Sequence, residues 1–386
     1  MRCTLPFSLK LLWSPFVEIY HFKSFGRRKS WVIPTQLAMC AVFIYLKDNI
    51  ETLLVEKHVN FTTAILTFLV VTMTCQDIAV DSWAVEMLHP ANSSYGSSSQ
   101  SMGITLGAFV SSSVFIALNS PEFCQQWVYG AWWYVKVASP PAVDGEGLPE
   151  PVLTLQGFIF MWACFQAAVT AYIALCVPEV PRARQGEEGE DADGAIDETQ
   201  VTLSQTFAIF RDVVSNKNLQ IWFLFKLGTA AAQSIYDNVG GVYLTSDLGY
   251  DRENHAFAGV VTKPVDIALS FVIGYMASER PLRLLATNML VGILTSTYAV
   301  LYMMAYFPPK EEQDHLTFLH VTLVDFLAKS NSTFAFVADF ALIQMVTDKR
   351  LSGIHVTCLA TVSNQASFFH KLYIFRLIDS FGIFIP

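Results

Sequence analysis

Long apolar stretches alternate with short polar connections along most of the chain. A helix that crosses a bilayer needs about 20 mostly apolar residues. By that measure the pattern predicts nine full membrane spans and a short first stub. The predicted helices are 5–20 for the stub, then 31–47, 61–81, 98–118, 154–177, 219–245, 256–277, 284–307, 318–346 and 352–376. The sequence therefore predicts an all-α polytopic membrane bundle.

Composition agrees with a membrane protein and narrows the chemistry. The chain is 53% hydrophobic and 15% charged, whereas soluble domains carry about 25% charged residues. The seven cysteines form no CxxC pair and no Cys/His cluster with zinc spacing, so no metal site and no cofactor is predicted. The net charge of −9 comes largely from the run "EEGEDADGAIDE". That run indicates a solvated linker, so the net charge says little about partners. No nucleic-acid partner is predicted.

The acidic run divides the chain into two halves. We expect an N-terminal lobe over 1–177, a cytosolic linker over 178–216 and a C-terminal lobe over 217–386. Such a halved helical bundle is the plan of many secondary transporters. Basic residues gather in the loop "HFKSFGRRKSW" and in every second loop after it, which predicts that these loops face the cytosol. The sequon "NFT" at Asn60 then lies on the lumenal side and is a predicted glycosylation site, whereas the sequons at Asn92 and Asn331 are not.

Acidic residues interrupt the apolar segment around "TCQDIAVDSWAVEML". An ionisable side chain within a span costs about 2.5–3.5 kcal/mol, so these residues need a reason to be there. Asp77 and Asp81 are four residues apart and share one helix face. They have no local cation, so they require partners from other helices or a bound proton. Glu86 points elsewhere, near the cytosolic end, where we expect water to solvate it.

Two other spans carry the same kind of feature. Lys226, Gln233 and Asp237 fall on one stripe, and Asp325 and Lys329 form an i,i+4 pair with Asp339 on nearly the same face. If the stub is the second of twelve helices, the charged spans are the fourth, seventh and tenth. The major facilitator plan places its cavity-lining helices at those positions. The alternative reading is that such pairs only close helix–helix contacts. We also expect the small residues of "GITLGAFVSSSV" to form a packing surface. Further charges are predicted at Lys263 and Asp266, beside a kink at Pro264.

Three stretches closely resemble the acetyl-coenzyme A transporter family, an endoplasmic-reticulum branch of the major facilitator superfamily related to bacterial muropeptide permeases. They are "FSLKLLWSPFVE", "FGRRKSWVIPTQ" and "QDIAVDSWAVEML". The resemblance covers most of residues 7–120 and is patchier over 150–365. Matched motif by motif, it implies functional roles for Gln76, Asp77, Asp81 and Trp83, for Gly26, Arg27, Arg28 and Lys29, and for Asp237. Ser82 stands where the family motif has Gly, and Glu86 is an additional acid.

The resemblance implies transport of acetyl-CoA from the cytosol into the lumen of the endoplasmic reticulum, where it supplies lysine acetylation; exchange against free CoA is compatible with it. The substrate is strongly anionic, so its cavity needs cations that bind phosphate. We expect Lys226 and Lys329 to be cavity cations, with Gln76, Gln233 and Trp83 contacting substrate. Coupling and gating are predicted for Asp77, Asp81, Asp237, Asp325, Glu18, Arg27, Arg28 and Lys29. Glu18 lies eight residues before Gly26, which departs from the superfamily's loop pattern.

Two other functions remain open at this point. Compared with the family, the chain begins late in the second helix and lacks the first and last helices. It could therefore be a transport-inactive member that acts as a regulatory partner in the bilayer, for instance by joining a full-length copy as a homo-oligomer. The other function is a membrane acyltransferase, for which His320, five residues before Asp325, is the candidate.

We expect Asn60→Gln to abolish the gel-mobility shift that an N-glycosidase produces on the protein from cells, because only a lumenal sequon is glycosylated. Asn92→Gln is the matched control and should leave the shift unchanged. A shift that survives Asn60→Gln contradicts the predicted topology.

Overall fold

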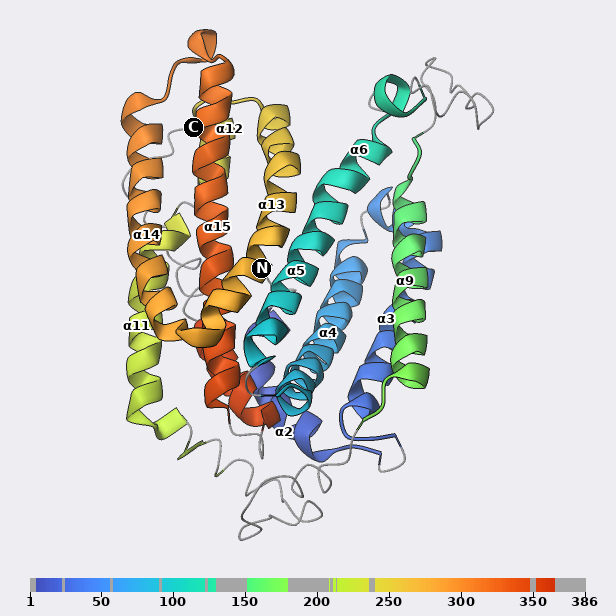
Figure 1. The fold of residues 1–386 in the computed structure, drawn as a ribbon. Coiled ribbons are helices and arrows are strands. Elements are labelled where there is room, and N and C mark those ends of the chain that lie inside the picture. The colour runs from blue at the N-terminus through green and yellow to red at the C-terminus, as the bar shows by residue number, and fades with distance from the viewer. Residues whose placement is uncertain are drawn as a thin grey trace.

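The structure is a computed structural model of the 386-residue chain. It describes residues 5–22, 25–55, 58–89, 92–121, 124–129, 151–179, 208, 211–212, 214–235, 240–347 and 352–364. Within these ranges the chain forms helices and their connections, with no strand. Figure 1 shows two groups of helices standing side by side. The predicted all-α class is confirmed, while the domain boundaries at 177 and 217 remain predictions.

The first group of helices surrounds α3. Its helix α3 packs against α4 on one side and α9 on the other, and α2 packs on α4. A π-helical turn joins α5 to α6, so the predicted span 98–118 is one continuous rod. The helices are α1 (Leu5–Ser8), α2 (Lys10–Ile19), α3 (Lys29–Val55), α4 (Val59–Met87), α5 (Ser93–Phe109), the π turn Val110–Val114, α6 (Phe115–Asn119), the π-helix Cys124–Tyr129 and α9 (Leu155–Cys176).

The second group surrounds α15, which packs on both α13 and α14. The predicted span 219–245 corresponds to two helices, α11 and α12, and the last predicted span is helical over its described part, 352–364. Asp314 caps α15 by accepting a hydrogen bond from the Thr317 N–H at 3.0 Å. The helices are α11 (Lys217–Ile235), α12 (Gly241–Ser246), α13 (Arg252–Glu279), α14 (Pro281–Leu301), the π turn Tyr302–Tyr306, the short 3₁₀-helix Lys310–Glu312 and α15 (His315–Val346).

Several of these helices suit a bilayer. Judged by length and composition alone, five of the described helices could cross a membrane: Val59–Met87, Ser94–Asn119, Leu155–Cys176, Phe257–Glu279 and Pro281–Tyr306. The other predicted spans are helical as well, in α3, α11, α15 and 352–364. The chain is therefore a polytopic helical membrane protein.

The basic loops share one end of the bundle. In Figure 1 the chain before α3, the end of α9, the turn between α13 and α14 and the end of α15 all lie at the lower end. That arrangement agrees with the single topology predicted from Lys and Arg. Asn60 is exposed in the first turn of α4, at the opposite end of the bundle. Asn331 is buried within α15, which makes that sequon inaccessible, as expected.

The two groups meet chiefly where α5 packs against α13 and α15. Ser98 and Ser101 of α5 are buried, and the Ser101 hydroxyl lies 3.1 Å from the Ser270 hydroxyl of α13. Gly274 faces the same contact: a Cβ placed there would lie 1.8 Å from Ser98 Oγ and 3.0 Å from Ser98 Cβ. Small residues allow this close approach of two helices within a membrane.

The expectation that "GITLGAFVSSSV" forms a packing surface is wrong for its two glycines. No described heavy atom lies within 4 Å of a Cβ placed at Gly103 or Gly107. Helices α5 and α13 are close near the start of α5 and diverge toward α6 (Figure 1). The close contact therefore uses the preceding serines, before the helices separate.

We expect Gly274→Ala to lower the melting temperature of the detergent-purified protein by several degrees, because overpacking a tight contact costs about 1–3 kcal/mol. Gly259→Ala on the same helix is the control, since no described heavy atom lies within 4 Å of its added methyl group. Equal melting temperatures for the two variants contradict the tight α5–α13 contact.

Candidate functional site

A buried lysine forms ion pairs with the two aspartates of α4. Lys10, at the start of α2, is only 2% exposed, and its Nζ lies 3.0 Å from Asp77 Oδ2 and 3.7 Å from Asp81 Oδ2. Gln100 of α5 donates a hydrogen bond to Asp81 Oδ1 at 3.2 Å. Asp77 and Asp81 therefore do share one face, and their cation does come from another helix. Sequence reasoning missed Lys10, although a lone lysine inside the apolar stub was a usable signal.

The Lys10 cluster, defined as Lys10, Asp77, Asp81 and Gln100, has more negative than positive charge. Two carboxylates share one ammonium, and Asp81 is 4% exposed. Buried charges are tolerated when they are paired and hydrogen-bonded, as these are. The cluster joins α2, α4 and α5, so a change at Lys10 acts on three helices at once.

A second cluster forms at the end of the bundle that carries the basic loops. We call it the gate cluster: Glu18 of α2, Arg27 and Arg28 of the following loop, and Glu86 of α4. Glu18 accepts from Arg27 Nη1 at 2.9 Å and from Arg28 Nη1 at 3.0 Å. Glu86 accepts from Arg28 Nη2 at 2.5 Å and also pairs with Arg27. Glu18, despite its unusual spacing from Gly26, reaches both arginines.

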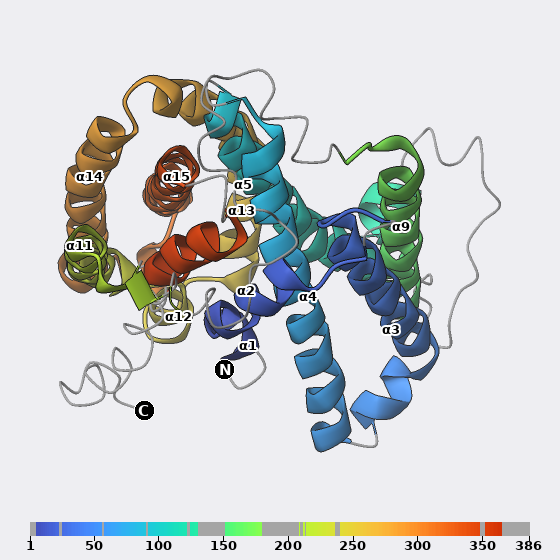
Figure 2. The ribbon, with the colours of Figure 1, turned by 90° about the horizontal axis from the view of Figure 1, so that it is seen from below.

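The helix over 352–364 brings the second group of helices to the gate cluster. Ser352 Oγ accepts from Arg28 Nη2 at 2.9 Å and donates to Glu86 Oε1 at 2.5 Å. A Cβ placed at Gly353 would lie 1.9 Å from Glu18 Oε2, so this backbone approaches as closely as a glycine allows. Figure 2, seen from this end, shows the helix (red) beside α15 and reaching toward α2.

Apolar packing reinforces this junction. Val85 of α4 packs with Val356, Cys358 and Leu359 of helix 352–364, and Leu11 of α2 borders the same cluster. Ile343 and Phe340 of α15 and Leu219 of α11 complete it. The two groups of helices are thus closed against each other at the basic-loop end.

Arg28 is the centre of the gate cluster and is 0% exposed. Burial by itself would lower its pKa, but the carboxylates of Glu18 and Glu86 outweigh that effect and raise the pKa of Arg28 above its ordinary value. The guanidinium therefore stays charged. The expectation that water solvates Glu86 is wrong: its side chain is 14% exposed and is paired with both arginines, because the loop before α3 folds back over the end of α4.

The second group of helices holds its own ion pairs. Lys226 Nζ of α11 lies 3.0 Å from Asp339 Oδ2 of α15 and 5.7 Å from the centroid of the Trp222 ring. Lys329 pairs with Asp325 one turn away at 2.5 Å. Asp266 of α13 accepts from the Ser330 hydroxyl at 2.9 Å. Each predicted cavity lysine is therefore paired with a carboxylate of its own lobe.

Comparison with known proteins bears on what these clusters do. The family model described as "Acetyl-coenzyme A transporter 1" matches residues 2–283 and 283–385. The chain belongs to the acetyl-coenzyme A transporter family. An uncharacterized protein of Schizosaccharomyces pombe is 27% identical over 383 residues, which cover 97% of this chain and 66% of that protein. An uncharacterized membrane protein of Saccharomyces cerevisiae is 24% identical over 445 residues, covering 99% of this chain and 76% of that protein. The anhydromuropeptide permease of Escherichia coli is 26% identical over 147 residues, 38% of this chain and 28% of the permease.

In this member of the acetyl-coenzyme A transporter family, three other predicted site residues lie apart from the clusters. Trp83 packs in an apolar cluster with Val17 and Ile78, and the buried Gln76 Oε1 has no hydrogen-bond partner among the described residues. Lys29 Nζ donates to the Ala174 carbonyl at 3.4 Å instead of joining the gate cluster. The Asp237 residue and the Gln233 side chain lie outside the described residues. Their proposed roles remain predictions.

The histidine of the acyltransferase alternative has other partners. His320 stacks on Tyr302 with centroids 4.0 Å apart, and its Nε2 lies 2.9 Å from the Tyr298 hydroxyl. Asp325 instead pairs with Lys329. His320 and Asp325 therefore do not form the His–acid pair that this alternative requires. Among the described residues no group of three or more His, Cys, Asp or Glu side chains could hold a metal ion.

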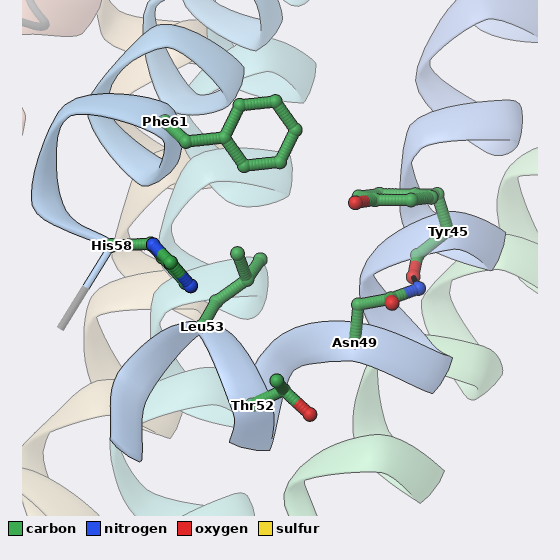
Figure 3. A pocket seen from close by; sticks show the side chains of 6 residues that line it. All are labelled: Tyr45, Asn49, Thr52, Leu53, His58 and Phe61. Carbon is green, nitrogen blue, oxygen red and sulfur yellow. Dashed lines mark hydrogen bonds between the residues drawn. The ribbon is translucent and has the colours of Figure 1, made fainter. Parts of the chain in front are cut away.

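A pocket of about 330 Å³ lies at the opposite end of α3 and α4 (Figure 3). Tyr45 and Phe61 meet edge to face across it, with centroids 6.4 Å apart. None of its described lining residues is a lysine or an arginine, so these residues do not offer the charge that phosphate groups need. Its lining residues are Tyr45, Asn49, Thr52, Leu53, His58 and Phe61.

We expect Lys10→Gln to lower the melting temperature sharply, because removing one partner of a buried ion pair costs about 3–5 kcal/mol. Adding Asp81→Asn should recover part of the loss by removing one of the two facing carboxylates. Lys310→Gln is the control, since its exposed ammonium lies 3.8 Å from Asp251. If Lys10→Gln melts like Lys310→Gln, the Lys10 cluster does not stabilise the fold.

Proposed function

We propose that this chain transports acetyl-CoA from the cytosol into the lumen of the endoplasmic reticulum by alternating access. Membership of the acetyl-coenzyme A transporter family supports the substrate, and the likeness to a bacterial permease supports a carrier. The chain spans 66% of the length of its Schizosaccharomyces pombe relative, so the activity of a whole carrier is part of the proposal. Localisation to the endoplasmic reticulum follows from the resemblance of its motifs.

The observation that carries the proposal is the junction of the two helix groups at the gate cluster. Ser352 and Gly353 lie directly on Arg28, Glu86 and Glu18. A carrier that alternates must close one end of its path while the other is open. For the basic-loop end to open, helix 352–364 has to leave this cluster. The two groups can remain in contact at the α5–α13 interface, which is built of serines and a glycine, while the basic-loop end opens.

Three lysines within the helix groups suit an anionic cargo. Lys10, Lys226 and Lys329 each form an ion pair with a carboxylate. The phosphates of acetyl-CoA would compete with those carboxylates for the same ammonium groups. CoA carries the same phosphates as acetyl-CoA, so a site that binds through them also accepts CoA. Exchange of the two is therefore part of the proposal.

The alternative function is a regulatory membrane partner without transport of its own. The observation that favours it is that Lys10, Lys226 and Lys329 each already pair with a carboxylate of their own helix group. Such pairs could simply hold helices together. Reconstitution separates the two functions, because a regulatory partner shows no flux alone and associates with a full carrier.

We expect the purified chain in proteoliposomes to take up radiolabelled acetyl-CoA. Asp77→Asn and Lys226→Gln should each lower the initial rate at least tenfold at unchanged protein content, because each removes a charge that the substrate or its counter-charge requires. Lys310→Gln is the control and should retain the rate. No uptake by the correctly folded, unmodified chain contradicts the proposal, and losses that follow protein abundance show a structural role instead.

A further inference from the structure

Glu179 follows α9 and lies against the loop that carries the arginines of the gate cluster. Its Oε1 accepts a hydrogen bond from the backbone N–H of Arg28 at 2.7 Å, and its Oε2 accepts from the backbone N–H of Lys29 at 3.0 Å. These two N–H groups open helix α3 and have no partner within that helix. One carboxylate thus satisfies both of them, at the helix end where negative charge is favourable.

The loop is shaped for this contact. Gly26 has a φ of +91°, a conformation that residues with a side chain rarely adopt. A Cβ placed at Gly26 would lie 2.4 Å from Glu179 Oε2. The turn at Gly26 therefore presents the N–H groups of Arg28 and Lys29 to the Glu179 carboxylate and leaves room for that carboxylate.

A second contact fastens the same two segments. Lys29 Nζ donates to the carbonyl of Ala174 in the last turn of α9 at 3.4 Å. The end of α9 and the start of α3 are therefore tied by backbone and side-chain bonds together. Glu179 is also the second residue of the predicted linker 178–216.

We propose that Glu179 is a positioning residue of the gate cluster, which acts by holding the backbone that carries Arg28. The proposal rests on the proposed carrier function, since it concerns how one end of the path closes. Arg28 is held on its backbone side by Glu179 and on its guanidinium side by Glu18, Glu86 and Ser352. Because the fixed backbone orients the Arg28 guanidinium, loss of the Glu179 carboxylate should weaken the hydrogen bond between Arg28 and Ser352.

The native Cys358 reports opening of this end. Its side chain is 1% exposed and packs in the cluster with Val85 of α4, so a maleimide reaches it only when helix 352–364 moves away. The experiment measures the rate at which N-ethylmaleimide modifies Cys358 in the full chain, read by peptide mass spectrometry. It needs no substrate, so it tests Glu179 whether or not the chain transports acetyl-CoA.

We expect Glu179→Ala to raise the modification rate at least fivefold, and Glu179→Gln, which keeps one acceptor oxygen, to lie between it and the unmodified chain. Asp212→Asn is the matched control: it removes an exposed linker carboxylate and should leave the rate unchanged. In an Arg28→Gln background, which opens the gate directly, Glu179→Ala should add nothing, because Glu179 acts through Arg28.

Two results overturn the proposal. One is a Glu179→Ala rate equal to that of the unmodified chain. The other is an effect of Glu179→Ala that multiplies with that of Arg28→Gln, since independent effects show that Glu179 supports the fold without positioning Arg28. The milder Glu179→Gln variant, checked by size-exclusion chromatography, keeps the comparison valid if Glu179→Ala misfolds.

Discussion

The buried guanidinium of Arg28 is the constraint on which the closed end of the bundle depends. A fully buried charge is tolerated only with partners on every side, and Arg28 finds them in Glu18, Glu86 and Ser352. Those partners come from α2, α4 and helix 352–364. One side chain thereby fixes three helices at the end where the basic loops gather. The Lys10 cluster repeats the principle deeper in the bundle, where a single ammonium ties α2 to α4.

The contacts between the two helix groups differ along the bundle. At the basic-loop end, polar and charged groups meet around Arg28 and Ser352, beside the apolar cluster of Val85 and Val356. Along α5 and α13 the contact is made by serines and Gly274, whose small size lets the backbones approach. A smooth surface of small residues permits one helix to tilt on another, whereas the hydrogen bonds of the gate cluster require one specific arrangement of its helices. This division suits a molecule whose halves rock about a shared contact.

Local patterns could be predicted from the sequence, and pairings across the fold could not. Helical spacing placed Asp77 and Asp81 on one face, and apolar run lengths gave the helices. The partner of those aspartates, Lys10, is 67 residues away from Asp77, and no periodicity connects such positions. Glu86 shows the same limit of sequence reasoning. The helical pattern predicts which way its side chain points, but not that Arg27 and Arg28 lie beside it. Gly103, Gly107 and Gly274 look alike in sequence, and only the divergence of α5 from α13 tells which of them is packed.

The distribution of charge within the gate cluster has an electrical consequence. Glu18, Arg27, Arg28 and Glu86 all belong to the first helix group, and their formal charges cancel. The second group contributes a hydroxyl at Ser352 and bare backbone at Gly353. Among the described residues, opening this end as proposed would therefore separate no opposite ions across the cluster; it would break hydrogen bonds to charged groups, each worth about 1.5–3 kcal/mol. For these contacts there is no large Coulomb barrier between the closed and the opened arrangement.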